Sequence, residues 1–266
     1  MNANIYNIEG KNTKQVELPA VFKSRFEKSL VTRALLAEQS LRYQPQGHNV
    51  MAGMNTTAAY IGEYSTYRTG RHMGIAVRPR QKLAGGAMGA VRRIPSAVKG
   101  RRAHPHKIDK ITVEKINAKE YRKALSSAIA GTTKLELVAE RAKVTEKMQL
   151  PIVFEDSIEK VAKAKDLVKI LNVLGLKEDL QASHDPKNRK GLRRSTNNRR
   201  FRKSVLLVVS NEAALEKAGR NIPGIDVARV DMLRVEKVAP GSIPRLTIWS
   251  ESALGKVASA IEKARL

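Results

Sequence analysis

The 266-residue sequence contains no cysteine, and aromatic side chains make up only 4% of it, with a single tryptophan. Without cysteine the chain can have neither a disulfide framework nor a thiolate metal site. Single-stranded bases are recognised mainly by stacking on exposed rings, so the scarcity of aromatic residues disfavours that mode of binding. Thiolate chemistry and base stacking are therefore poor explanations of what the chain does.

Long apolar runs are also missing. The longest stretch without a charged side chain, residues 43–62, is interrupted by Pro45, Gly47 and Gly53, which disfavours a membrane-spanning helix. The basic parts of the chain lack the large apolar residues that a membrane-surface helix needs. The first six residues lack the basic start and apolar run of a signal peptide. We therefore expect a cytoplasmic protein without a membrane partner.

Acidic side chains are absent from two windows that hold much of the basic charge. Residues 64–108 contain 11 Lys or Arg residues and residues 186–211 contain nine, with no Asp or Glu in either window. The whole chain has 50 basic and 25 acidic residues, so 30 basic residues face 25 acidic ones outside the windows. The net charge of +25 thus falls to +5 when both windows are removed. Two cationic segments on a nearly neutral chain are typical of a protein that lies along a polyphosphate.

Hydrophobic periodicity predicts strands that alternate with helices outside the first basic window. Strands are predicted at residues 4–8, 15–18, 150–154, 204–210, 225–230 and 246–249. Helices are predicted at about 24–43, 117–131, 133–136, 161–175, 177–182, 211–219 and 251–264, the first two opening on capping-box patterns. This order predicts an α/β fold, a three-layer α/β/α sandwich with a mostly parallel central sheet. Residues 1–43 and 109–266 would form its globular body.

Residues 44–108 are expected to form a long irregular internal extension of this body. Residues 47–100 hold nine of the 17 glycines, and Pro79, Pro95 and Pro105 interrupt any regular pattern. Ordering some sixty residues costs on the order of 60–120 kcal/mol of backbone entropy. The segment has too few large apolar side chains to offset that cost by burying itself. We therefore expect it to become ordered only against a partner.

The cationic side chains of both windows are candidate RNA-binding residues. Arginine grips phosphate through a planar fork, and glycine lets the backbone approach a helix closely. In the first window the candidates are Arg68, Arg71, Arg78, Arg80, Lys82, Arg92, Arg93, Lys99, Arg101, Arg102, His104 and Lys107. In the second basic segment, residues 186–203, they are Lys187, Arg189, Lys190, Arg193, Arg194, Arg199, Arg200, Arg202 and Lys203. The competing interpretations are a solvated basic tail for the first and a nuclear-targeting or generic basic patch for the second.

Residues that could support catalysis are few. The glycine cluster at 85–89 does not follow a predicted strand and lacks the Gly-Lys-Ser/Thr sequence of a phosphate-binding loop. His104 and His106 could suggest a metal site or a general base, but Pro105 between them prevents their presentation on one helix face. Asp156 follows a strand, but Ser157 is expected to cap a helix there, where an acidic residue is favourable. We expect no catalytic residue, no metal site and no cofactor.

Residues 97–105, together with 92–95 before them, closely resemble the family of the universal large-subunit ribosomal protein four in its archaeal–eukaryotic branch. Three further stretches are similar in the same order: residues 3–6 with 18–22, residues 208–210 with 221–227, and residues 238–241 with 246–253. The resemblance therefore covers essentially the whole chain. The sequence departs from the family pattern at 242–245, which lack the expected glycines, and at His106, where a second proline is common.

The resemblance implies a structural constituent of the large ribosomal subunit that binds large-subunit rRNA and supports assembly. Its internal extension would reach the wall of the nascent-peptide exit tunnel, beside the large-subunit protein numbered twenty-two. Residues 78–93 would form the tip and residues 99–107 the returning limb. The tip candidates are Arg78, Arg80, Lys82, Gly85, Gly86, Met88 and Arg92. The protein would be a monomer within the ribosome, without a small-molecule substrate.

An alternative class remains open, an RNA-modifying enzyme whose sandwich binds a cofactor at the carboxyl ends of its strands. That function needs a glycine-rich turn after the first strand of the sandwich. Neither residues 154–157 nor residues 209–211 supply those glycines. A regulator that also binds messenger RNA is a third hypothesis, which the sequence neither supports nor opposes.

Overall fold

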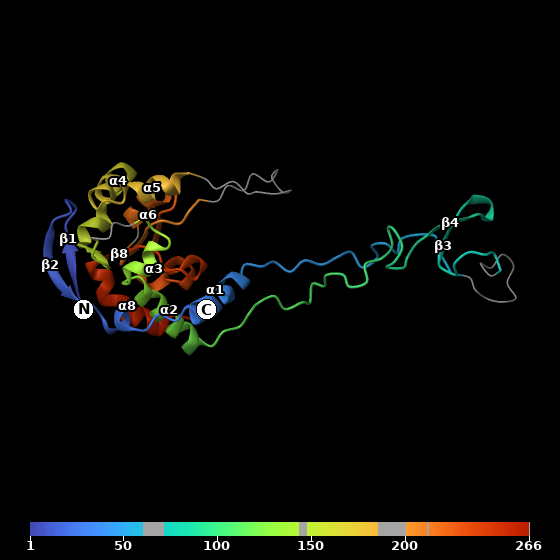
Figure 1. Cartoon of the computed structure of the whole chain (residues 1–266), viewed down its shortest axis with the longest axis horizontal. Coiled ribbons are helices and arrows are strands. Elements are labelled where there is room, and N and C mark those ends of the chain that lie inside the picture. Colours follow the sequence, from blue (N-terminus) through green and yellow to red (C-terminus); the bar gives the residue numbers. More distant parts are fainter. Residues whose placement is uncertain (61–71, 144–147, 186–200, 212, 266) are drawn as a thin grey trace. The chain divides into compact units, whose positions relative to one another are not determined.

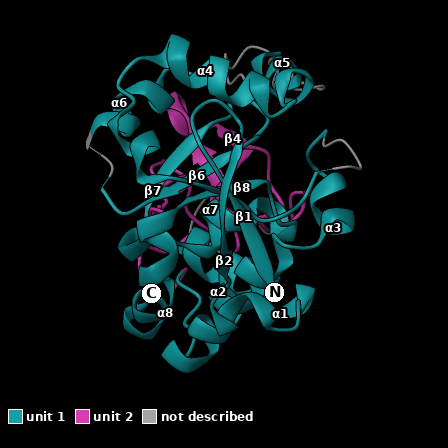
Figure 2. Ribbon diagram, turned by 90° about the vertical axis from the view of Figure 1, so that its left-hand side faces the viewer, with its two compact units in different colours: residues 1–42, 113–266 teal, residues 43–112 magenta. Residues whose placement is uncertain are grey.

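The computed structural model describes residues 1–60, 72–143, 148–185, 201–211 and 213–265. It divides into two compact units: unit 1 comprises residues 1–42 and 113–266, and unit 2 comprises residues 43–112 (Figure 2). The boundaries expected from the sequence, after residues 43 and 108, differ from these by four residues or fewer.

Unit 1 is organised around a six-stranded sheet with the strand order β2-β1-β5-β8-β6-β7. Its strands are β1 (Asn2–Tyr6), β2 (Asn12–Glu17), β5 (Ile152–Phe154), β6 (Leu206–Val209), β7 (Asp226–Arg229) and β8 (Thr247–Ser250). The β1–β2 pair is antiparallel and every other pair is parallel. The expected mostly parallel sheet is therefore confirmed.

Helices follow or precede the strands along the chain, as Figure 1 shows by colour and label. They are α1 (Lys28–Ser40), α2 (Ala118–Gly131), α3 (Leu135–Ala139), α4 (Ala164–Val173), α5 (Lys177–His184), α6 (Ala213–Arg220), α7 (Val235–Val238) and α8 (Glu251–Lys263). No helix in the described ranges is long and apolar enough to span a bilayer.

The two faces of the sheet carry separate hydrophobic cores because side chains alternate along each strand. In β6, Leu206 and Val208 belong to one core, whereas Leu207 and Val209 belong to the other. The first core is covered by α1, α2, α7 and α8, and the second by α3, α4 and α6. This arrangement confirms the three-layer sandwich.

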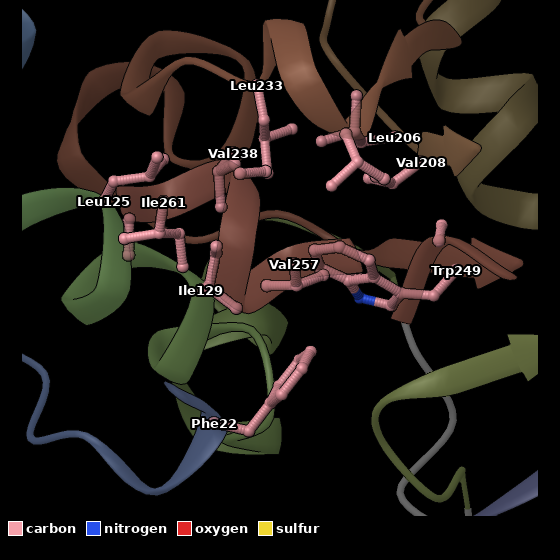
Figure 3. Packing of buried hydrophobic residues seen from close by; sticks show 14 of the residues in the cluster. Phe22, Leu125, Ile129, Leu206, Val208, Leu233, Val238, Trp249, Val257 and Ile261 are labelled. Atoms are coloured by element: carbon pink, nitrogen blue, oxygen red, sulfur yellow. The ribbon is translucent and has the colours of Figure 1, made fainter. Parts of the chain in front are cut away.

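Trp249 lies at the centre of the first core (Figure 3). Its indole is fully buried and meets the ring of Phe22 edge-on, with ring centroids 5.4 Å apart. Edge-on aromatic pairs contribute about 0.5–1.5 kcal/mol beyond their buried area. Phe22 belongs to a short 3-10 helix, Ala20–Lys23, so this contact fixes the segment that leads into α1.

Helix starts match the sequence signals only in part. Ser250 caps α8 as expected, accepting a hydrogen bond from the Ala253 amide at 3.3 Å. The predicted capping box at residues 24–27 is wrong, because Ser24 ends the preceding 3-10 helix and α1 begins only at Lys28. The amide of Glu27 is bound instead by the Ser127 hydroxyl of α2 at 2.8 Å, so a tertiary contact replaces the local cap.

Unit 2 contains a short hairpin, which was not predicted within the expected long irregular extension. Its antiparallel strands are β3 (Arg80–Lys82) and β4 (Met88–Val91). The chain turns between them because Gly85 and Gly86 adopt positive φ angles of 73° and 81°, which residues with a Cβ disfavour. The sequence signal was weak since cationic and small residues occupy the strands. Among the described residues of unit 2, Ala58 alone is a buried hydrophobic residue.

Candidate nucleic-acid interface

Two limbs of unit 2 lie side by side and are joined through their backbones. The amide of His48 donates to the His106 carbonyl at 3.1 Å, and the amide of Ala59 donates to the Arg80 carbonyl at 3.3 Å. These residues are far apart in sequence but belong to the outgoing and returning limbs. Unit 2 is therefore a paired structure built from main-chain contacts rather than from a side-chain core.

Glycine is required where the limbs approach most closely. A Cβ on Gly53 would lie 2.5 Å from the Gly100 carbonyl oxygen, and Gly53 has a φ of +76°. Within the returning limb, a Cβ on Gly100 would lie 1.9 Å from the carbonyl oxygen of Ile94. Both distances are far shorter than any real Cβ contact. Gly53 thus lets the two limbs approach each other, and Gly100 permits a tight turn within the returning limb.

The cationic side chains of unit 2 have no carboxylate partners. Within the described residues no ion pair involves any of them, and Asp109 is the one acidic residue of unit 2 that the structure describes. Arg92 and Arg93 are half-buried and donate to the carbonyls of Val98 at 2.7 Å and Ala58 at 3.1 Å. Arg80 is also half-buried. The exposed candidates are Arg78, Lys82, Lys99, Arg101, Arg102, His104 and Lys107.

The tip candidates fall on the hairpin and the residues beside it. Arg80 and Lys82 lie in β3, Met88 lies in β4, and Gly85 and Gly86 form the connection between the strands. The candidates Arg78 and Arg92 flank the hairpin. Arg68 and Arg71 lie outside the described residues.

The second basic segment is described only at its carboxyl end. Arg202 pairs with Asp179 at 3.1 Å, and Lys203 pairs with Asp226 at 2.8 Å. Both cations are thus bound to unit 1, and their contact with RNA stays a prediction. The remaining candidates lie outside the described residues: Lys187, Arg189, Lys190, Arg193, Arg194, Arg199 and Arg200.

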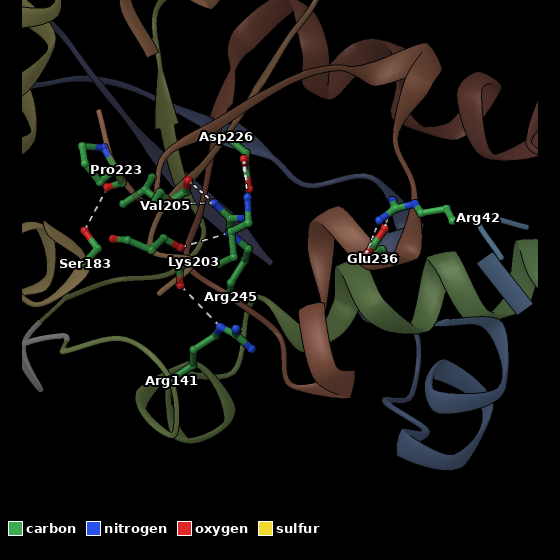
Figure 4. Close-up of polar contacts among 11 residues, drawn as sticks. Arg42, Arg141, Ser183, Lys203, Val205, Pro223, Asp226, Glu236 and Arg245 are labelled. Carbon is green, nitrogen blue, oxygen red and sulfur yellow. Dashed lines mark hydrogen bonds and ion pairs between the residues drawn. The ribbon is translucent and has the colours of Figure 1, made fainter. Parts of the chain in front are cut away.

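A buried arginine holds the chain where this segment enters the sheet (Figure 4). The side chain of Arg245 is only 1% exposed and pairs with Asp226 at 2.6 Å. It also donates to the carbonyls of Ser204 at 3.0 Å, Gly224 at 3.3 Å and Val205. Burial lowers the pKa of Arg245, while the charge of Asp226 opposes that effect. A buried charge is tolerated here because nearly every donor has an acceptor.

The carboxylate of Asp226 joins two cations. Burial by itself would raise the pKa of Asp226, but Arg245 and Lys203 together hold it below its usual range. The carboxylate is therefore ionised at neutral pH and binds both side chains. Since Lys203 ends the second basic segment, the pair connects that segment to the buried network.

A second carboxylate, Asp179 of α5, is completely buried beside this network. It accepts hydrogen bonds from the Lys143 amide at 2.9 Å and from the Ser204 hydroxyl, in addition to its pair with Arg202. In the same α5, the Ser183 hydroxyl lies 3.0 Å from the Pro223 carbonyl (Figure 4). Residues 202–204 are consequently held to α5 by side-chain contacts, and the Ser204 amide donates a hydrogen bond to the Gly224 carbonyl at 2.8 Å.

The end of unit 1 that leads into unit 2, residues 38–42, is also held by side-chain contacts. Buried Glu38 of α1 accepts the Tyr121 hydroxyl and the amides of Val235 and Glu236, both at 2.8 Å. Burial, and then the hydrogen bond to Glu38, raise the pKa of Tyr121. Arg42 forms a two-pronged ion pair with Glu236 (Figure 4). Hydrogen bonds and an ion pair thus hold this end of unit 1 as far as Arg42, its last residue before unit 2.

A further hydrogen bond within unit 1 connects the segment before unit 2 with the segment after it. The Ser40 hydroxyl accepts the amide of Glu114 at 2.9 Å. Ser40 precedes unit 2 and Glu114 follows it, so this bond joins the chain segments that lead into and out of that unit.

The carboxyl edge of the sheet, where a cofactor would bind in an enzyme of this fold, is filled by an acidic side chain. Glu159 accepts the amides of Ser210 at 2.7 Å and Asn211 at 3.2 Å, and the Ser250 hydroxyl at 2.7 Å. Those donors are the kind that would hold an anionic group. Their occupation by a carboxylate leaves this edge without the glycine-rich anion cradle of the alternative hypothesis.

Asp156 also has a structural partner, since its carboxylate accepts the Ser252 amide at 2.8 Å at the start of α8. The expected cap by Ser157 is wrong, because its hydroxyl is buried without a hydrogen-bond partner. The described ranges hold no group of three or more His, Cys, Asp or Glu residues that could bind a metal.

Two arginines outside the basic windows were missed by sequence reasoning. Arg141 and Arg245 converge on residues 203–205 from distant parts of the chain. A lone arginine directly before the apolar strand β8 was a signal for Arg245, because a charge so close to a buried strand needs partners. Arg141 gave no comparable signal.

These features define a class: an α/β sandwich with an interrupting, backbone-paired unit whose positive charge is uncompensated. The chain belongs to the ribosomal protein L4/L1 family, whose model matches residues 16–260. The resemblance that the sequence motifs indicated is therefore confirmed.

Several archaeal proteins named large ribosomal subunit protein uL4 match this chain over nearly its whole length. The Methanocaldococcus jannaschii protein is 38% identical, over 98% of this chain and 100% of the relative. The Archaeoglobus fulgidus protein is 41% identical, over 96% and 97%. The Methanoculleus marisnigri protein is 40% identical, over 97% and 98%. The chain is thus similar throughout to large-subunit ribosomal proteins.

Proposed function

We propose that this chain is a structural constituent of the large ribosomal subunit that binds large-subunit rRNA through unit 2 and the second basic segment. The observation that supports the proposal most strongly is the uncompensated charge of unit 2. Cations without carboxylate partners on a backbone-paired segment suit the phosphates of packed RNA helices. The names of the relatives supply the ribosomal context.

The binding would depend strongly on salt and little on base identity. Six to ten neutralised phosphates give a slope of log affinity against log salt of roughly −5 to −9. The exposed arginines supply planar forks for phosphate, and the scarcity of aromatic rings leaves few platforms for stacking. Recognition would therefore rest on the shape of A-form RNA and on its phosphates.

The same unit would act in assembly and at the nascent-peptide exit tunnel. The hairpin, residues 80–91, would form the part of the tunnel wall contributed by this protein, beside the large-subunit protein numbered twenty-two. Residues 99–107 would pack on rRNA as the returning limb. Binding several RNA helices at once would support subunit assembly. The protein would be a cytoplasmic monomer within the ribosome, without a membrane partner or a small-molecule substrate.

We further propose that the chain has no enzymatic role. The physical support is the use of Glu159 and Asp156 as internal hydrogen-bond acceptors for amides and hydroxyls of unit 1. A carboxylate committed to three donors is poorly placed to act on a substrate. Calorimetry with nucleotide cofactors checks this point, and we expect no specific heat of binding.

Sucrose-gradient fractionation of a cell lysate, with an antibody against this chain, tests the proposed function. We expect co-migration with the large subunit and with whole ribosomes, and release of the chain at high salt. A cytosolic enzyme of similar size serves as the control that stays at the top of the gradient. Recovery of the chain only at the top would contradict the proposal.

A further inference from the structure

The buried network of unit 1 contains more cations than carboxylates. Arg202 pairs with Asp179, while Lys203 and Arg245 share Asp226. Arg141 completes the set of four cations. It has no carboxylate within ion-pair distance among the described residues. The network thus carries a surplus of positive charge, and that surplus is centred on Arg141.

The guanidinium of Arg141 is held in place by carbonyl groups. Its Nε donates to the Lys203 carbonyl at 3.4 Å (Figure 4). Its Nη1 donates to the Pro240 carbonyl. No described residue accepts a hydrogen bond from Nη2. The residue is half-buried, so part of its side chain remains accessible. A guanidinium that is already held in one orientation loses little conformational entropy when it binds a ligand.

The electrostatic surroundings of Arg141 favour an anion. Burial lowers its pKa, and the neighbouring charges of Arg245 and Arg202 lower it further. Asp179 acts in the opposite direction but is already paired with Arg202. The guanidinium groups of Arg141, Arg202 and Arg245 repel one another. One further negative charge beside Arg141 would relieve this repulsion.

We propose that Arg141, assisted by Arg202, forms a binding site on unit 1 for one RNA backbone phosphate. The inference rests on the proposed rRNA-binding function and adds a contact outside both basic windows. The two non-bridging oxygens of a backbone phosphate can accept hydrogen bonds from a planar guanidinium. A phosphate is favoured over a carboxylate of another protein because the second basic segment, which ends beside the site, is itself expected to lie on RNA. The site would place an RNA strand beside residues 202–204, where the second basic segment joins the sheet.

Salt-dependent binding of the full chain to an in vitro transcribed archaeal large-subunit rRNA tests this site. Arg141→Gln should weaken binding about tenfold, since one charge-assisted hydrogen bond is lost. It should also reduce the salt slope by about one, as expected for one phosphate contact. The matched control is Arg220→Gln, which removes an exposed arginine paired with Glu216 on α6 and should leave both values unchanged.

Arg141→Lys separates binding from folding. Lysine keeps the charge but loses the fork, so we expect the salt slope to persist and the affinity to fall by several-fold. Circular dichroism of each variant without RNA checks that the fold is intact. If Arg141→Gln does not fold, Arg141→Lys decides: wild-type affinity in this folded variant would overturn the proposal.

Inorganic phosphate provides an independent probe of the same site. At equal ionic strength, phosphate should raise the thermal midpoint of the wild type and of Arg220→Gln more than chloride does, and Arg141→Gln should lose this difference. Wild-type rRNA binding with an unchanged slope in Arg141→Gln would overturn this site alone. Absence of rRNA binding by the wild type would instead overturn the proposed function, and this inference with it.

Discussion

Unit 1 and unit 2 are stabilised by different kinds of contact. Unit 1 buries two hydrophobic cores on the faces of its sheet, and its internal charges are mostly paired. Unit 2 buries only Ala58 among its described hydrophobic residues and is held by hydrogen bonds to its main chain, from backbone amides and from side chains such as Arg93. It also carries 12 of the 20 large hydrophobic residues that are exposed in the described structure. We therefore expect unit 1 to fold alone and unit 2 to become ordered only against a partner surface.

The two units also differ in whether their charged side chains have partners of opposite charge. In unit 1, Arg245 lies in the interior because Asp226 and three carbonyls surround it. In unit 2, arginines such as Arg78 and Arg101 face solvent without an acidic partner. Internal pairing stabilises a fold, and unpaired charge leaves a surface available for a polyanion. The proposed RNA-binding surface therefore lies on the unit with the weaker internal stabilisation.

Deletion of residues 64–108 should produce the largest effect. We expect the shortened chain to keep its helical circular dichroism and solubility, because all the described α-helices belong to unit 1. Stable incorporation into large subunits should be abolished, since the deleted segment holds the exposed cations. Sucrose gradients of cells that express the tagged variant measure this. Incorporation at the wild-type level would show that unit 2 is dispensable for binding.

Asp226→Asn should destabilise unit 1 by about 3 kcal/mol, because it leaves the buried guanidinium of Arg245 without a counter-charge. Urea unfolding followed by circular dichroism measures the loss. The matched control is Asp166→Asn, which breaks an exposed pair with Lys169 and should cost less than about 0.5 kcal/mol.

The same variant has a defined pH dependence. Arg245 and Lys203 hold the pKa of Asp226 below its usual range, although burial opposes them. The stabilising contribution of the carboxylate is therefore complete above the ordinary aspartate pKa of about 4 and is lost as pH falls through the lower folded-state pKa. Wild type and Asp226→Asn should differ most near neutral pH and converge in acid. An equal difference at every pH would contradict the ion pair.

Glu159→Ala should destabilise unit 1 by about 2 kcal/mol, because the amides of Ser210 and Asn211 lose their acceptor. Glu159→Gln keeps one acceptor oxygen and should lose roughly half as much. Urea unfolding again measures both variants. Unchanged stability in Glu159→Ala would mean that the carboxylate is available for another role, which would reopen the enzyme hypothesis.

Gly53→Ala should have the smallest effect and should be confined to unit 2. The added Cβ would lie 2.5 Å from the Gly100 carbonyl oxygen, so the limbs must separate. Gly85→Ala is a matched control with a similar φ of +73° but nothing within 4 Å of its Cβ. We expect Gly53→Ala to weaken rRNA binding about tenfold more than Gly85→Ala, which corresponds to about 1.4 kcal/mol. Equal affinities would show that close limb pairing does not matter for binding.

The sandwich was predictable because each strand carries its own signal. The apolar run of β6 and the Ser250 cap of α8 are local features, and both appear in the structure as expected. The start of α1 was not predictable from residues 24–27, because a hydroxyl from α2 replaces the local cap at Glu27. Local patterns cannot reveal a contact between residues 100 positions apart.

The candidate site, like the fold, was predictable from the sequence only in part. The excess charge of unit 2 is a property of composition, so the sequence alone indicates it. The hairpin at 80–91 was missed, because its strands are short, partly cationic and exposed. The roles of Arg141 and Arg245 were hidden because their partners come from distant segments. Composition therefore predicts which segments carry charge, and only the fold shows which of those charges are already paired.

Hydrogen exchange of the full chain, free and bound to large-subunit rRNA, tests the difference between the units most directly. We expect amides in the strands and helices of unit 1 to be protected in both states. Amides of residues 72–112 should exchange rapidly in the free protein and become protected on the RNA. Strong protection of residues 72–112 in the free protein would contradict the expectation that unit 2 requires RNA for its order.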